Sequence, residues 1–174
     1  QERFDIGIEG DYILATYHPE TVNLGENKRN IAQFIMALRQ IPEQVLCSLP
    51  NADTEGSIIR EALKGYEVEE ADKIKCFENL GQVGYYTAMK NASLLIGNSS
   101  SGIIEASFYN KPVVNVGDRQ NGRSCGENVV HVKNETGEIL AGYERALKMR
   151  GEEFDNVYGK GDTSSQIIDV LLAG

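Results

Sequence analysis

The residues best suited to hold a phosphate group lie where an apolar segment ends and a helical pattern begins, between residues 94 and 106. Ser99 and Ser100 follow the apolar segment, and Gly102 comes shortly after them. The first N–H groups of a helix lack partners inside the helix and lie at the positive end of its dipole. We therefore expect a diphosphate to bind at this helix start, with both serine hydroxyls as further donors and Gly102 keeping the approach free of bulk.

An acidic side chain accompanies this loop. Glu105 lies about one turn into the predicted helix, where its carboxylate can accept hydrogen bonds from the two hydroxyls of a ribose. A purely structural interpretation is also open: Ser101 can cap the helix, Gly102 can serve close packing, and Glu105 can interact with the helix dipole in the first turn. A polar triplet at the carboxyl end of a strand, where open α/β sheets bind ligands, favours a binding role.

His18 is the candidate catalytic residue. It follows the apolar segment 12–17 and therefore lies at the same rim as the serine loop if both segments are parallel strands. A histidine there can donate to a phosphate oxygen or pass a proton to a departing diphosphate, because imidazole titrates near neutrality. The other histidine, His131, lies inside the apolar segment 128–132, and we interpret it as structural.

Two further loops carry candidate ligand contacts. Arg119 lies in a glycine-bearing loop after the segment 112–116, where its guanidinium can form paired hydrogen bonds with phosphate or contact a base. A surface arginine in an acidic protein can equally serve as a solvated counter-charge. Asn51 follows the segment 44–49 and is free to face a ligand at the rim.

The elements that position these residues alternate along the chain. Apolar segments of strand length occur at 12–17, 44–49, 73–77, 94–97, 112–116 and 128–132. Helical periodicity occurs at 27–40, 55–64, 82–90, 135–149 and 164–173. This alternation predicts an α/β fold with a parallel, Rossmann-like sheet covered by helices on both faces, and the length of 174 residues predicts one domain.

Composition narrows the function. The net charge of -9 argues against binding to nucleic acid, and we expect no membrane segment because no apolar run approaches the length that spans a bilayer. The odd number of cysteines, Cys47, Cys76 and Cys125, and the lack of a signal-peptide pattern favour reduced thiols in the cytoplasm. Without CxxC pairs or GxGxxG after the first strand, we expect no metal and no cofactor. The start at Gln1 suggests a fragment of a longer chain.

Four motifs together resemble the C-terminal domain of UDP-N-acetylglucosamine 2-epimerases over nearly the whole chain. They are Thr16–Pro19, Pro50–Asp53, Gly97–Glu105 and Pro112–Arg123, in the order and spacing of that family. The non-hydrolysing branch usually has an Arg-rich run after the histidine and an Asp-Ser-Gly-Gly phosphate loop. This chain instead resembles the hydrolysing branch of the sialic-acid pathway.

The resemblance implies that these residues contact UDP: His18, Asn51, Leu80, Ser99, Ser100, Gly102, Glu105 and Arg119. In this assignment His18, Ser99 and Ser100 meet the diphosphate, Glu105 the ribose, and Leu80 the uracil. Such enzymes have two Rossmann-like domains of the GT-B type. They eliminate UDP from UDP-N-acetylglucosamine and then add water, giving N-acetylmannosamine.

The resemblance therefore implies UDP and a UDP-sugar as ligands, an absent N-terminal domain of the same chain as partner, and a homo-oligomer of the full-length enzyme as a further possibility. The sugar can be N-acetylglucosamine or a 2,4-diacetamido relative, because both share every UDP contact. Two alternatives stay open: the nucleotide-donor domain of a GT-B glycosyltransferase, and a non-catalytic UDP-sugar sensor. The isolated fragment is expected to be inactive, because the carboxylates for acid and base chemistry lie on the other domain.

Overall fold

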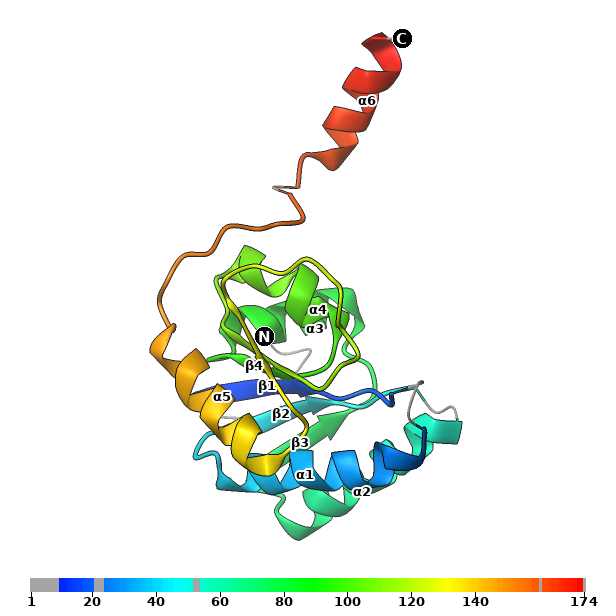
Figure 1. Cartoon of the computed structure of the whole chain (residues 1–174), viewed down its shortest axis with the longest axis vertical. Helices are drawn as coiled ribbons and strands as arrows, with labels where there is room; N and C mark the ends of the chain where they lie inside the picture. Colours follow the sequence, from blue (N-terminus) through cyan, green and yellow to red (C-terminus); the bar gives the residue numbers. More distant parts are fainter. Residues whose placement is uncertain (1–9, 21–23, 52–53, 160, 174) are drawn as a thin grey trace.

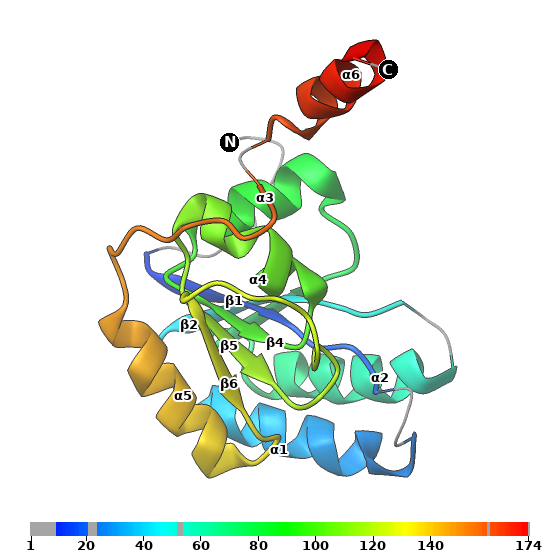
Figure 2. The ribbon, with the colours of Figure 1, turned by 45° about the horizontal axis from the view of Figure 1, so that its top comes forward.

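A computed structural model describes residues 10–20, 24–51, 54–159 and 161–173. Its centre is a six-stranded parallel sheet in the order β3-β2-β1-β4-β5-β6 (Figures 1 and 2). The strands are β1 (Tyr12–Thr16), β2 (Gln44–Ser48), β3 (Ile74–Phe77), β4 (Leu95–Gly97), β5 (Val113–Val116) and β6 (Val129–Val132). All six lie within the predicted segments, and the predicted α/β fold class is confirmed.

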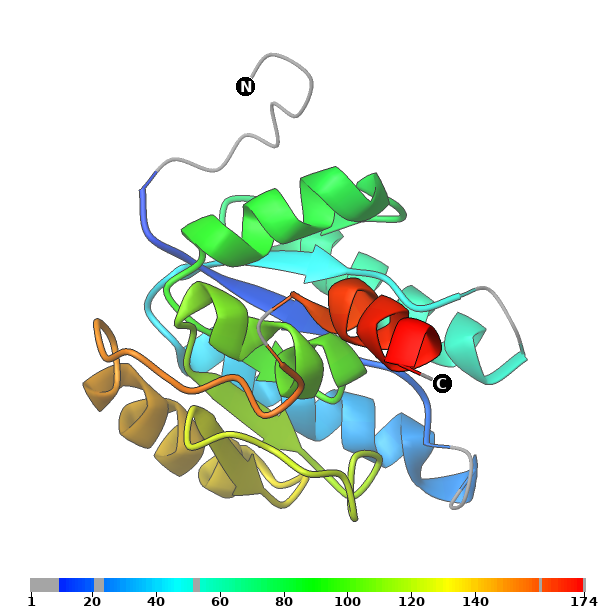
Figure 3. The same cartoon turned by 90° about the horizontal axis from the view of Figure 1, so that it is seen from above.

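Helices cover both faces of the sheet (Figure 3). One face carries α1 (Asn27–Gln40), α2 (Thr54–Glu69) and α5 (Thr136–Lys148), and the other carries α3 (Gly81–Asn91), α4 (Ser100–Ile104) and the 3-10 helix η2 (Ala106–Tyr109). A short 3-10 helix η1 (Leu24–Glu26) precedes α1. The strands are apolar almost throughout because side chains on both faces of the sheet are buried under helices.

The prediction for α2 was too short by five residues at its C-terminal end, since the sequence pattern ended at 64 and the helix ends at Glu69. The apolar stripe continues through the last turns, where Ile59, Leu63 and Tyr66 are buried under the sheet at helical spacing. The polar residues between these positions face solvent and obscure the period. Packing of Tyr66 against the core therefore extends the helix beyond the part that the sequence marks clearly.

The C-terminal helix α6 (Thr163–Ala173) extends away from the rest of the domain (Figure 1). All its described residues are exposed, including large apolar side chains: Ile167, Ile168, Val170, Leu171 and Leu172. A helix with this much exposed apolar surface is typical of a segment that packs on another structure. Among the residues that the structure describes, no helix is long and apolar enough to cross a membrane.

The order of the strands places a change of direction between β1 and β4. Chain connections run from β1 outward through β2 to β3, and then return to β4 on the other side of β1. In open α/β sheets, ligands bind outside the carboxyl ends of the strands at such a switch point. Here these ends are Thr16 and Gly97, which are register partners in the β1–β4 pair.

Candidate functional site

The carboxyl ends of β1 and β4 approach each other closely at Gly97. This residue has φ +137°, and a Cβ atom at its position would lie 1.9 Å from the carbonyl oxygen of Thr16. Only glycine tolerates both this conformation and this contact. Gly97 therefore brings the loop that carries His18 and the loop that carries Ser99 side by side.

Asn98 joins these two loops through its side chain. Its Oδ1 accepts a hydrogen bond from the backbone N–H of His18 at 2.7 Å, and its Nδ2 donates to the carbonyl of His18 at 2.9 Å. The side chain is fully buried, and such paired bonds fix both the position and the direction of the His18 backbone. Asn98 was not among the predicted site residues. The sequence signal that could have identified Asn98 is a polar residue directly after an apolar strand, inside a motif that we assigned to phosphate binding.

The loop after β5 is held by the same residue. Arg119 Nη1 and Gln120 Nε2 both donate to the backbone carbonyl of Asn98, at 3.0 Å and 2.8 Å. Burial lowers the pKa of Arg119, and the nearby charge of Arg123 lowers it further. Arg119 is thus anchored by a hydrogen bond at the rim between β4 and β5 while its side chain stays exposed, so the role as a counter-charge stays open. Its contact with a ligand stays a prediction.

Ser99 is the N-cap of α4. Its φ and ψ of -76° and 143° are those of an extended residue, and its hydroxyl accepts from the backbone N–H of Ser101 at 3.4 Å. The alternative in which Ser101 is the cap is therefore wrong, because Ser101 already lies inside the helix. Ser100 is the first helical residue and is half-buried. The predicted helix start thus lies directly after Ser99.

A chain of hydroxyl groups supports this helix start from the α3 side. The Tyr85 hydroxyl lies 2.7 Å from Ser101 Oγ and 3.3 Å from Thr16 Oγ1, and Ser101 Oγ lies 2.9 Å from Ser99 Oγ. These hydrogen-bonded hydroxyl groups connect α3, β1 and α4. They therefore fix the orientation of the Ser99 hydroxyl relative to the end of β1. No sequence pattern distinguishes Tyr85 from the other tyrosines, of which the chain has eight in all.

Gly102 packs against the sheet. A Cβ atom at this position would lie 3.0 Å from Val113 Cγ1, and the Gly102 N–H donates to the carbonyl of Ser99 at 3.2 Å. Both observations support the packing alternative for this glycine. A contact between Gly102 and a phosphate stays a prediction.

A pocket of about 290 Å³ opens beside the helix start. Leu80, Tyr86, Ser101 and Glu105 are among its lining residues, and so is Phe77 at the end of β3. The pocket has an apolar part and a carboxylate, which suits a ligand with a flat ring and a diol. The structure thus brings together Leu80 and Glu105, two of the predicted contacts that lie far apart in the sequence.

Glu105 has the properties of a ligand-binding carboxylate. Burial raises the pKa of Glu105 above its ordinary value, while its own backbone N–H and the Tyr86 hydroxyl lower it in part. One carboxyl oxygen, Oε2, is buried and has no hydrogen-bond partner among the described residues. The alternative in which Glu105 interacts with the helix dipole in the first turn is wrong, because α4 ends at Ile104 and Glu105 lies at its C-terminal side.

The remaining candidates lie around this pocket rather than in it. His18 is half-buried beyond the end of β1, with its backbone fixed by Asn98. Asn51 is exposed after β2, and residues 52–53 of its motif lie outside the described part of the chain. His131 lies in the edge strand β6 and is exposed, and its structural role stays a prediction.

The sequence profile of the family described as UDP-N-acetylglucosamine 2-epimerase matches residues 2–172. The chain belongs to this family. The resemblance that rested on four motifs is therefore confirmed for the family, and the epimerase fold is confirmed by solved structures. The crystal structure of UDP-GlcNAc 2-epimerase from Neisseria meningitidis bound to UDP-GlcNAc has a TM-score of 0.73 and 21% identity, and the match covers 95% of this chain and 45% of that one.

Curated relatives from two other bacteria carry more specific names. The UDP-N,N'-diacetylbacillosamine 2-epimerase (hydrolyzing) of Legionella pneumophila is 34% identical over 98% of this chain and 45% of its own length. The GDP/UDP-N,N'-diacetylbacillosamine 2-epimerase (hydrolyzing) of Campylobacter jejuni is 33% identical over 88% of this chain and 39% of its own length. The chain thus spans less than half the length of these relatives.

Proposed function

We propose that this chain is the UDP-binding half of a hydrolysing UDP-sugar 2-epimerase. The observation that carries the proposal is the pocket of about 290 Å³ in which Leu80, Ser101 and Glu105 meet beyond the carboxyl ends of β2 and β3, in a chain of the epimerase family. In this arrangement uracil lies against Leu80, the ribose hydroxyls donate to Glu105, and the diphosphate extends toward Ser99, Ser100 and the start of α4.

His18 is the residue of this chain that acts on the leaving group. It lies at the end of β1 beside the loop of Ser99, since Asn98 binds its backbone. From this position its imidazole donates a proton or a hydrogen bond to the diphosphate as the bond to the sugar breaks, and the N–H groups of α4 stabilise the developing charge. Elimination also needs an acid and a base at the sugar ring, and we assign these to an N-terminal domain.

The exposed apolar side chains of α6 support such a second domain. In the full-length enzyme this helix packs on the N-terminal domain, so that Leu171 and Leu172 are buried there. The sugar is UDP-N-acetylglucosamine or a 2,4-diacetamido sugar. The names of the Legionella and Campylobacter relatives favour the diacetamido sugar over UDP-N-acetylglucosamine, the substrate that the predicted sialic-acid pathway implies.

Ligand-dependent melting tests the binding part of the proposal. UDP at about a hundred times its dissociation constant is expected to stabilise the domain by about 2.7 kcal/mol, with a much smaller effect of uridine, because the diphosphate provides the anchor. Equal effects of both ligands contradict the diphosphate site at α4.

Turnover tests the catalytic part. The fragment is expected to release no UDP from UDP-N-acetylglucosamine or from UDP-N,N'-diacetylbacillosamine, whereas the two-domain protein releases UDP and the 2-epimeric amino sugar without an acceptor. Sustained turnover by the fragment that is lost in His18→Ala shows that the acid and base lie on this domain. An intact UDP-sugar after incubation with the two-domain protein favours a glycosyltransferase or a sensor.

A further inference from the structure

Three side chains outside the nucleotide pocket are arranged as a nucleophile, a base and an orienting group. Cys125 Sγ lies 3.3 Å from His131 Nε2, and the other imidazole nitrogen, Nδ1, lies 3.1 Å from the carboxamide nitrogen of Asn115. Cys125 belongs to the loop between β5 and β6, while Asn115 and His131 are register partners in those two strands. The sheet therefore fixes the base, and the loop delivers the thiol to it.

The exposure of the three side chains suits a buried orienting group, an accessible base and an accessible nucleophile. Asn115 is 1% exposed and so forms a rigid support, whereas His131 is exposed and Cys125 is half-buried. When the carboxamide oxygen faces Nδ1, the imidazole donates from Nδ1 and accepts the thiol proton at Nε2. When the carboxamide nitrogen faces Nδ1, the imidazole donates from Nε2 to the sulfur. Only the first arrangement leaves Nε2 free to accept the thiol proton, which is the pattern of an activated nucleophile, whereas the second leaves Nε2 protonated.

We propose that the Asn115 carboxamide presents its oxygen to His131 Nδ1, and that Cys125 is thereby a reactive thiol, activated by His131, that forms mixed disulfides with small disulfides. The thiol proton passes to His131 Nε2 while Sγ attacks one sulfur of the disulfide. A new S–S bond forms, the old S–S bond breaks, and the leaving thiolate takes the proton from His131. Cys125 is oxidised to the mixed disulfide, and the other half of the small disulfide is reduced to a thiol.

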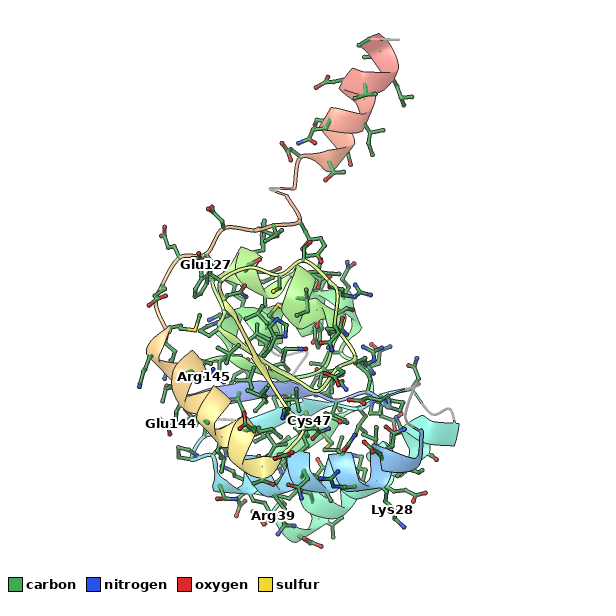
Figure 4. The ribbon with its side chains drawn as sticks, in the orientation of Figure 1. Lys28, Arg39, Cys47, Glu127, Glu144 and Arg145 are labelled. Carbon is green, nitrogen blue, oxygen red and sulfur yellow. The ribbon has the colours of Figure 1, made fainter. Side chains whose placement is uncertain are left out.

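The surroundings of Cys125 select the charge of the reagent. Cys125 lines a cavity of about 710 Å³ together with Glu127, Glu153 and Asp155, and no lysine or arginine is among the described residues that line it. Glu127 belongs to the loop between β5 and β6 that also carries Cys125, and it lies near the segment that leads to α6 (Figure 4). Three carboxylates attract cations and repel anions. The site therefore prefers a cationic disulfide such as cystamine over an anionic one such as oxidised glutathione.

The other two cysteines provide internal references in the same molecule. Cys47 is fully buried in β2, and Cys76 donates from Sγ to the carbonyl of Leu63 at 3.7 Å (Figure 4 shows Cys47). Neither cysteine is hydrogen-bonded to a histidine in the part of the chain that the structure describes. Burial slows both thiols, so their modification reports whether the domain stays folded, and the effect of the base is measured by the comparison of wild type with His131→Gln.

The experiment follows modification of each cysteine in the folded, reduced chain by quenching, digestion and mass spectrometry. With neutral iodoacetamide, Cys125 is expected to react at least about tenfold faster than Cys47 and Cys76, and His131→Gln is expected to slow Cys125 by about tenfold or more. Lys133→Gln, which changes an exposed residue just after β6, is the matched control and leaves the rate unchanged.

Equal Cys125 rates in the wild-type and His131→Gln proteins, with unchanged circular dichroism, overturn the activation by His131. Should His131→Gln unfold the domain, His131→Asn replaces it in the same comparison. With disulfide reagents, cystamine is expected to modify Cys125 at least about fivefold faster than oxidised glutathione at low salt, and Glu127→Gln with Glu153→Gln reduces this ratio. A glutathione rate equal to or above the cystamine rate overturns the charge preference.

Discussion

Asn98 binds the backbone of His18 from both sides, accepting from its N–H at 2.7 Å and donating to its carbonyl at 2.9 Å. Because the Asn98 carbonyl also accepts from Arg119 and Gln120, one buried residue at the end of β4 holds the loops that follow β1 and β5. The geometry of the whole rim depends on this connection.

Removal of the Asn98 side chain is expected to destabilise the domain. Asn98→Ala removes both side-chain hydrogen bonds to the His18 backbone, which costs about 1 to 3 kcal/mol in the free energy of unfolding, and it is also expected to weaken UDP binding because the His18 loop is released. Urea unfolding and titration calorimetry measure the two effects. The control is Asn91→Ala, which removes an exposed bond to the carbonyl of Thr87. Equal losses in both variants contradict a special role of Asn98.

Gly97 is expected to tolerate no side chain. Gly97→Ala places a Cβ atom against the Thr16 carbonyl and forces a residue with φ +137°, so we expect a loss of more than about 3 kcal/mol or failure to fold. Gly137→Ala is the matched control, since a Cβ atom there meets nothing within 4 Å and Gly137 lies inside α5. That control is expected to gain about 0.4 to 1 kcal/mol. Thermal melts of the two variants measure these opposite changes in stability, and similar melting temperatures contradict the constraint at Gly97.

Replacement of Ser99 and of Ser100 is expected to lower protein stability by different amounts but to lower UDP affinity in both cases. Ser99→Ala removes the N-cap of α4 and costs about 1 kcal/mol of stability, whereas Ser100→Ala changes a residue inside the first turn and costs much less. Both variants are expected to weaken UDP binding while leaving uridine affinity unchanged, because the hydroxyls face the diphosphate in the proposed site. A parallel loss of uridine affinity places the serines elsewhere in the site.

Glu105→Gln is expected to raise stability at neutral pH and to weaken UDP. The variant removes a carboxylate that burial disfavours. In the proposed site it also replaces charged hydrogen bonds to ribose by neutral ones, a loss of about 1 kcal/mol or more in binding. Melting curves and calorimetry on the same preparations report the two opposite effects. Glu153→Gln, at an exposed position, is the control for the loss of one negative charge.

The stability effect of Glu105 depends on pH in a defined direction. Because its pKa is raised in the folded state, the folded protein binds this proton more tightly than the unfolded chain does. Its favourable contribution is complete below the ordinary glutamate pKa and is lost as pH rises through the raised value. The difference in unfolding free energy between wild type and Glu105→Gln is therefore expected to move against the wild type from about pH 4 to pH 7. A difference that stays constant over this range contradicts the buried carboxylate.

The sequence alone determined most helices and strands of this protein and the small polar residues that follow β4. Apolar strands, amphipathic helices and a strand followed by small polar residues are local patterns, because each follows from the backbone period of its own segment. The prediction of α2 was incomplete because burial of Tyr66, a tertiary contact, carries the stripe through polar neighbours.

Only the tertiary structure decided which distant residues meet. The hydrogen bonds between the Asn98 side chain and the His18 backbone depend on β1 pairing with β4 in one register, and the pocket shared by Leu80 and Glu105 depends on the packing of α3 beside α4. The contact between Cys125 and His131 likewise depends on the pairing of β5 with β6. Strand order and register come from the balance of packing over the whole core, and no local pattern of residues contains that information.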